Sequence, residues 1–188
     1  MDIAKFIENV NGVDWQKYDD AEYFKYRYDG INSFAQTAPM PLIALAAADN
    51  ESDELLYKPL VENFDKFHFS ANGYISHNVL CAIGNDHSGN YYPVAREALP
   101  FIIEVALYGN HLVARNCAIN ILIDLYYFSP GNFHEDEETA NELEQCVSKT
   151  IRDMIAEHRG NFLKFAIDDT RNKSLIEGLL CIVDEQDE

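Results

Sequence analysis

Apolar residues recur every three to four positions along much of this chain, which is the spacing of one face of an α-helix. The first run predicts a helix over 3–10, with Asp2 as its N-cap and Gly12 at its end. Pro39 and Pro41 suit the first turn of a second helix, which ends at a polar pair. No segment alternates cleanly between apolar and polar residues, so the pattern predicts an all-α protein.

Proline, glycine and asparagine divide the middle of the chain. Ser52 is expected to cap a helix that Pro59 kinks or splits. Residues 67–74 are expected to form a loop that leads into another helix. The Gly84–Asn85 pair then ends that helix in the manner of a left-handed C-cap.

A helical hairpin follows. Pro93 opens a predicted helix over 94–108, and Gly109–Asn110 leads almost directly into a helix over 112–128. A connection this short places two helices antiparallel. The second helix is apolar nearly all round, as expected for a helix covered on most sides. Its polar exceptions form one narrow stripe: Asn116, Asn120 and Asp124.

The last part of the chain predicts three more helices. A long amphipathic helix begins at Thr139 and is expected to end at a Gly160 cap, followed by helices over 162–168 and 174–183. The whole pattern gives about eight or nine helices. At 188 residues the chain is most simply one domain, long enough to bury a core without metals or disulfides.

Three segments, taken in order, resemble a family of bacterial HEAT-like helical-repeat proteins. They are Val13–Trp15, the proline-led helix Pro41–Leu45 with Asp49 after it, and, most specifically, Gly84–Leu107. The third is similar to the family's Gly-Asn, His-x-Gly, Tyr and Ala-x-Pro-Phe-Leu-x-Glu pattern at Gly84, Asn85, His87, Gly89, Tyr92, Ala98, Pro100, Phe101 and Glu104. Ser88 stands where the family has glutamine.

The resemblance covers residues 10–128, and 139–183 look like a helical continuation of a single HEAT-like domain over 1–188. It implies antiparallel helical hairpins stacked as a short, HEAT/armadillo-like right-handed α-α superhelix. It carries no assigned chemistry. Many members resemble immunity proteins encoded beside polymorphic toxins, which implies a binding role.

The residue types in the third segment also suit a structural role. Gly84 and Gly89 permit backbone angles that other residues resist. Asn85 and His87 can hydrogen-bond the free backbone groups of a turn. Pro100 removes a backbone donor inside its helix and is expected to bend it. We therefore expect His87 to be a structural turn residue rather than a catalytic or metal-binding one.

Charge narrows the classes of partner. The chain holds 32 acidic and 14 basic residues, for a net charge of -18. A field of this sign repels phosphate backbones, so we expect no direct binding to nucleic acid. It would speed association with a basic protein partner. The alternative is that the acidic surface only keeps the protein soluble.

Acidic residues are concentrated in one window. Between Arg115 and Lys149 there is no basic residue, and the window holds Asp124, Glu135, Asp136, Glu137, Glu138, Glu142 and Glu144. These residues are candidates for a docking patch, with a plain solvated face as the alternative. His134 beside this run is the nearest approach to a metal site, but an acidic lead into a helix, favoured by the helix dipole, explains it better.

An aromatic segment near the N-terminus is the second candidate for partner binding. Tyrosine and tryptophan dominate interface hot spots, and here the candidates are Trp15, Tyr18 and Tyr23. The alternative is that these rings pack over the end of the helical stack.

No motif for chemistry stands out. The four cysteines form no CxxC pair and are expected to be buried free thiols in a reducing compartment. No nucleotide-binding or hydrolase motif is present, so we expect no cofactor, no metal and no catalytic residue. No apolar run is long enough for a membrane span, and the N-terminus does not resemble a signal peptide. These features predict a soluble cytoplasmic protein.

Three hypotheses of function follow. The first is an immunity-type inhibitor whose acidic face occludes a basic toxin domain. The second is a general scaffold or adaptor of a cytoplasmic complex. The third is an unrecognised enzyme, which would need a pocket with convergent polar groups.

Overall fold

The computed structural model describes residues 1–18, 38–48, 71–85, 89–130, 137–168 and 173–184. Within these ranges it contains seven α-helices, a short 3₁₀ helix η1 and three strands of two residues each. The helices are α1 (Ile3–Asn11), α3 (Pro39–Ala47), α5 (Ala71–Ile83), α6 (Ala95–Tyr108), α7 (Leu112–Tyr127), α8 (Glu137–Asp168) and α9 (Lys173–Asp184), with η1 at Trp15–Tyr18. The prediction of an all-α protein is confirmed.

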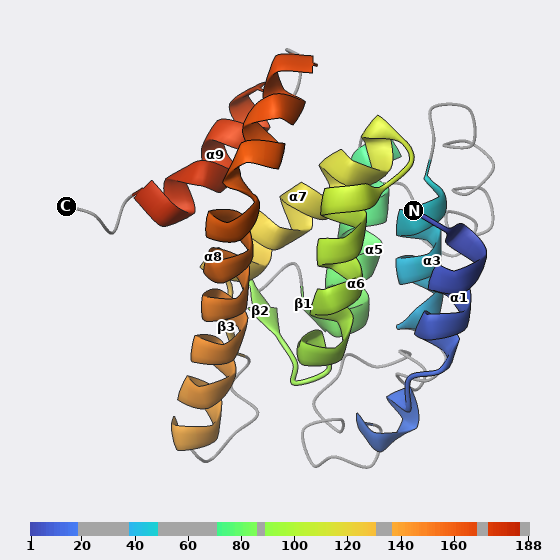
Figure 1. Cartoon of the computed structure of the whole chain (residues 1–188). Helices are drawn as coiled ribbons and strands as arrows, with labels where there is room; N and C mark the ends of the chain where they lie inside the picture. The colour runs from blue at the N-terminus through green and yellow to red at the C-terminus, as the bar shows by residue number, and fades with distance from the viewer. Residues whose placement is uncertain (19–37, 49–70, 86–88, 131–136, 169–172, 185–188) are drawn as a thin grey trace.

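The helices follow one another across the molecule, from α1 and α3 on the right of Figure 1, through α5 and α6, to α8 and α9 on the left. Helix α7 lies in the middle and packs against α3, α5, α6, α8 and α9. This central position explains why its sequence is apolar nearly all round, since every side meets a neighbour. The right-handed superhelical stacking of hairpins stays a prediction.

The α6–α7 hairpin is present where the sequence predicts it. Figure 1 shows α7 returning from the end of α6 after a short turn. Arg115 on α7 donates from Nε to the carbonyl oxygen of Ala106 at 3.1 Å. Its guanidinium also lies 3.6 Å from the ring centroid of Phe165 on α8. The Arg115 side chain therefore contacts both the last turns of α6 and the ring of Phe165 on α8.

The turn after α5 differs from the prediction. Gly84 and Asn85 do not form a left-handed cap but a strand, β1 (Gly84–Asn85), antiparallel to β2 (Asn90–Tyr91). Strand β3 (Ser129–Pro130) pairs with β2 in parallel. A Cβ atom at Gly84 would lie 2.3 Å from the carbonyl oxygen of Asn90, so this close pairing requires glycine. The left-handed conformation occurs instead at Gly89, with φ of 63°.

Two other predicted boundaries are wrong. Helix α5 begins at Ala71, inside the segment 67–74 that is predicted to be a loop. Helix α8 continues through Gly160 to Asp168, where the sequence predicts a cap and a new helix. A Cβ at Gly160 would meet no atom within 4 Å, so this glycine occupies an open helical surface. The predicted helix with Ser52 and Pro59 lies outside the described residues.

The N-terminal helix ends as predicted. The Asp2 carboxylate accepts from the backbone N–H of Lys5 at 3.1 Å, and Gly12 follows the last turn of α1. The apolar face of α1 buries Phe6 and Val10. These two residues belong to one apolar cluster, which continues through the described helices as far as Ile182 on α9.

The cysteines are free, but not all are buried as expected. Cys117 is buried in α7 and Cys81 is half-buried in α5, whereas Cys146 and Cys181 are exposed. An apolar neighbourhood in sequence therefore does not make a thiol buried.

Candidate functional site

Trp15, one candidate for partner binding, is a core residue. Its side chain is 3% exposed, and its indole Nε1 donates to the carbonyl oxygen of Val10 at 2.8 Å. Its ring centroid lies 6.4 Å from that of Phe101 on α6, which in turn makes an edge contact with Phe6. This burial favours the alternative that the ring packs over the end of the helical stack, and partner contact by Trp15 stays a prediction.

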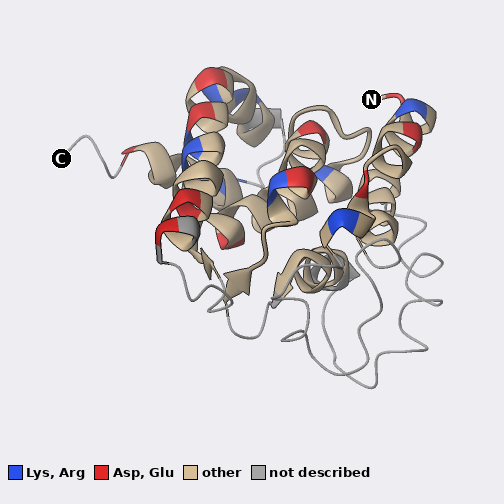
Figure 2. Cartoon of the chain, turned by 90° about the horizontal axis from the view of Figure 1, so that it is seen from below, with Lys and Arg blue, Asp and Glu red and all other residues tan. Residues whose placement is uncertain are grey.

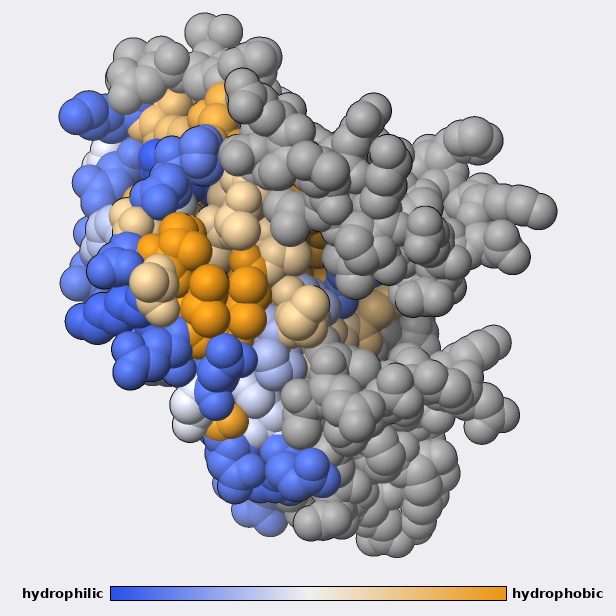
Figure 3. All heavy atoms as spheres, turned by 90° about the vertical axis from the view of Figure 1, so that its right-hand side faces the viewer, coloured by the Kyte–Doolittle hydropathy of each residue, from blue (hydrophilic) through white to orange (hydrophobic). Residues whose placement is uncertain are grey.

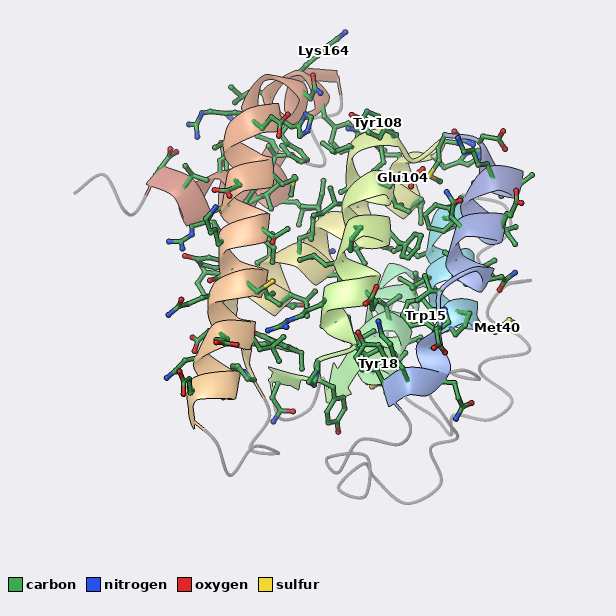
Figure 4. The ribbon with its side chains drawn as sticks, turned by 60° about the horizontal axis from the view of Figure 1, so that its bottom comes forward. Trp15, Tyr18, Met40, Glu104, Tyr108 and Lys164 are labelled. Atoms are coloured by element: carbon green, nitrogen blue, oxygen red, sulfur yellow. The ribbon has the colours of Figure 1, made fainter. Side chains whose placement is uncertain are left out.

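Tyr18 lies on the side of η1 that faces α6 (Figure 4) and is half-buried there. Its hydroxyl donates to Glu97 Oε1 at 3.1 Å, and Lys17 Nζ donates to the same oxygen at 2.6 Å. The Lys17 hydrogen bond holds the pKa of Glu97 below its usual value, while burial raises the pKa of Tyr18. The three side chains thus hold η1 on α6. Tyr23, the third aromatic candidate, lies outside the described residues.

The acidic window is divided among several places. Glu138 and Glu142 are exposed and one turn apart, on the same side of the first turns of α8. Glu144 is also exposed, but it follows Glu142 by two residues and so points about 160° away around the helix. Asp124 is half-buried on α7, and Glu137 is the first residue of α8. Glu135 and Asp136 lie outside the described residues.

The charge of Glu144 acts on the small sheet, although its side chain is exposed. Burial raises the pKa of Tyr91 on β2, and the negative charge of Glu144 raises it further. Tyr91 itself is 1% exposed. Of the described candidates, the structure therefore places only Glu138 and Glu142 together on an outward side.

The charge along α8 changes after these first turns. Figure 2 shows acidic residues at the beginning of α8 and basic residues only farther along it. Lys149 pairs with Asp153 on the same helix, and Arg159 makes two hydrogen bonds to the Asp184 carboxylate, at 2.9 and 3.0 Å. From Glu137 to Ser148 the helix holds no lysine or arginine. The first turns of α8 thus hold acidic residues and no lysine or arginine, and we call Glu138 and Glu142 the acidic pair.

The segment that carries the family resemblance lies between α5 and α6. Gly84 and Gly89 take part in the small sheet and its turn, as described above. Tyr92 is 4% exposed, and its backbone N–H donates to the carbonyl oxygen of Ile83 at 2.8 Å. Pro100 lies inside α6 with its ring exposed. Asn85 lies in β1, and His87 falls outside the described residues.

An exposed apolar surface was not predicted. Met40 on α3 is 61% exposed and points outward in Figure 4. Apolar atoms gather on the face shown in Figure 3, which is the side of the molecule where α1 and α3 lie in Figure 1. Helix α3 is apolar on every side, so its sequence contains no periodicity that separates Met40 from its buried neighbours.

Metal ligands are sparse in the described ranges. No group of three or more histidine, cysteine, aspartate and glutamate side chains there could hold a metal ion. A smaller pair does exist: the sulfur of Cys81 lies 3.5 Å from Nε2 and 3.8 Å from Nδ1 of His77. Among the described helices, none has both the length and the apolar character needed to cross a membrane.

Comparison with known proteins finds no family model, no curated protein and no solved structure that matches this chain. The resemblance of Gly84–Leu107 to HEAT-like proteins therefore stays a prediction. Any inference about function must depend on the arrangement of charge and packing described above.

Proposed function

We propose that this protein is a non-enzymatic protein-binding module, an immunity-type inhibitor that occludes a basic toxin domain through the acidic first turns of α8. One observation carries the proposal: Glu138 and Glu142 project from the same outward side of a helical segment that has no basic residue. The resemblance of Gly84–Leu107 to a family with immunity-type members agrees with this role.

Electrostatics supports a basic partner. The net charge of -18 attracts a cationic surface over long range, and the acidic pair offers a fixed place for it to dock. Enzymes that cleave nucleic acids need a positively charged site to hold phosphates, so an acidic surface can cover such a site. Carboxylates at a helix N-terminus also interact favourably with the helix dipole, and this accounts for part of their placement.

The test is capture of proteins from the native cell lysate by the full-length chain, at low and at high salt, followed by mass spectrometry. A single basic partner that high salt releases supports the proposal, because exposed charges are screened beyond about 10 Å at 0.1 M salt. The double variant Glu138→Lys/Glu142→Lys should lose this partner.

The matched control is Glu8→Lys/Glu157→Lys, which makes the same change in net charge at exposed residues on α1 and farther along α8. If both double variants lose the partner equally, net charge rather than the acidic pair governs binding. If neither loses it, the acidic pair is not the docking site.

The second candidate function is a general scaffold or adaptor, and the exposed apolar side chain of Met40 is the observation that favours it. Large exposed apolar surfaces commonly mark interaction sites. This function predicts a partner that stays bound at high salt and that binds both double variants as well as the unchanged protein.

A further inference from the structure

His77 and Cys81 form a thiol–imidazole pair on α5. They are four residues apart, so their side chains lie on the same side of the helix in consecutive turns. The Cys81 sulfur is 3.5 Å from Nε2 and 3.8 Å from Nδ1 of the imidazole, within hydrogen-bonding distance for sulfur. Rotation of the ring brings either nitrogen toward the thiol.

The surroundings of the pair leave it partly open. Between Ile75 and Ile83, the described residues of α5 are all buried except His77 and Cys81, which are half-buried. The pair is therefore the least buried part of this stretch of α5. A partly buried thiol with an imidazole neighbour is the setting in which cysteines become reactive.

The other cysteines lack this setting. Cys117 is fully buried, which protects it from solutes. Cys146 and Cys181 are exposed, but among the described residues neither sulfur has a hydrogen-bond partner. If exposure alone governed reactivity, these two would react first.

We propose that Cys81, assisted by His77, is a nucleophilic modification site for soft carbon electrophiles. The imidazole nitrogen takes the thiol proton, and the sulfur forms a bond to the electrophilic carbon. With iodoacetamide as the probe, the carbon–iodine bond breaks, iodide leaves with the bonding electron pair, and the proton stays on the imidazole. This inference is independent of the proposed protein-binding function.

A metal ion is the competing explanation of the pair. A tetrahedral zinc ion, with bonds of about 2.3 Å to sulfur and about 2.0 Å to nitrogen, would also hold the two atoms about 3.5 Å apart. However, zinc sites take at least three protein ligands, and no third histidine, cysteine, aspartate or glutamate joins this pair among the described residues. The available ligands therefore favour thiol chemistry over metal binding.

The experiment treats the native, full-length protein with limiting iodoacetamide and measures the initial labelling rate of each cysteine by peptide mass spectrometry. Cys81 is expected to react about fivefold faster than Cys146 and Cys181, although both are more exposed. In the His77→Gln variant the Cys81 rate should fall below theirs. The rates of Cys146 and Cys181 serve as internal controls, and circular dichroism checks that the variant is folded.

Equal or slower labelling of Cys81 in the unchanged protein would overturn the proposal, and this comparison needs no variant. A Cys81 rate that is the same in folded His77→Gln would also overturn it, because the imidazole would then play no part. Protection of Cys81 by one equivalent of Zn²⁺ would show that the pair is part of a metal site instead.

Discussion

The two regions that the sequence marks for partner binding, η1 with its aromatic residues and the first turns of α8 with their carboxylates, behave in opposite ways. In η1, Trp15 is buried and Tyr18 is bonded to Glu97. In α8, Glu138 and Glu142 remain exposed. Burial of a large apolar ring stabilises the folded protein, whereas burial of a carboxylate is unfavourable because the charge loses its hydration. Aromatic density near a chain end is therefore a poor sign of an interface where a neighbouring helix can cover it.

The largest expected effect is the loss of folding stability when the buried aromatic residue of η1 is removed. Trp15→Ala should reduce the free energy of unfolding by about 3–5 kcal/mol, because it empties a space against Phe101 and removes the hydrogen bond to Val10. Urea unfolding measures this loss. It is followed by circular dichroism rather than by tryptophan fluorescence, because the chain has one tryptophan and the variant has none. Trp15→Phe is the control and should cost less. A loss under about 1 kcal/mol for Trp15→Ala would mean that Trp15 is not a core residue.

The next largest effect is expected on the rate of partner association when the acidic pair of α8 is changed. Glu138→Lys/Glu142→Lys should slow association with a basic partner about tenfold at low salt, because these charges steer the encounter. It should change the free energy of unfolding by about 1 kcal/mol or less per residue, because both side chains are exposed and their interaction with the helix dipole is lost. Stopped-flow or surface-based kinetics at two salt concentrations measures the rates. If Glu138→Lys/Glu142→Lys lost as much stability as Trp15→Ala, these carboxylates would be as important for folding as the buried ring of η1.

A smaller effect concerns the ion pair that holds η1. Glu97→Gln should lower the free energy of unfolding by up to about 1 kcal/mol near neutral pH, a modest figure because both partners are partly exposed. Glu104→Gln on the same helix is the control. It removes a carboxylate that has no described ion pair and should have less effect.

The effect of Glu97 should depend on pH in a definite direction. Its pKa in the folded protein lies below the ordinary value of 4.5, so the unfolded chain binds the proton more readily. The stabilisation is therefore complete above that ordinary value and is lost as the pH falls through the lower, folded pKa. Unfolding curves of the unchanged protein and Glu97→Gln should converge as the pH falls from the ordinary value of 4.5 through the lower pKa of the folded protein. A difference that stays constant over this range would contradict the role of the carboxylate.

The smallest effect is expected from Tyr18→Phe. This change removes the hydroxyl that donates to Glu97 but keeps the ring and the Lys17 bond. The expected loss is about 0.5 kcal/mol, below the usual range for a hydrogen bond to a charged group, because the Glu97 side chain is partly exposed to water. Thermal unfolding in parallel with Glu97→Gln measures it. A loss larger than that of Glu97→Gln would mean that Tyr18, rather than Lys17, is the main attachment of η1 to α6.

Local features of the sequence determined most of the helices. The Asp2 cap and Gly12 bound α1, Pro93 precedes α6, and the Gly109–Asn110 turn separates α6 from α7, all as predicted. Such signals act within one or two turns of the chain, so they can be recognised without knowledge of distant residues. The apolar character of α7 likewise predicted a helix covered on most sides.

The tertiary structure decided the rest. Gly84 is in a strand because Tyr91 pairs with it, and Trp15 is buried because Phe101 on α6 lies against it. The residues of the predicted docking patch are divided because Glu144 points about 160° away from Glu142 around α8 and Asp124 is half-buried on α7. Glu138 and Glu142 share one exposed side. Helical periodicity specifies which residues share a face, but burial and charge pairing depend on which distant element covers that face, and this is settled only when the helices pack.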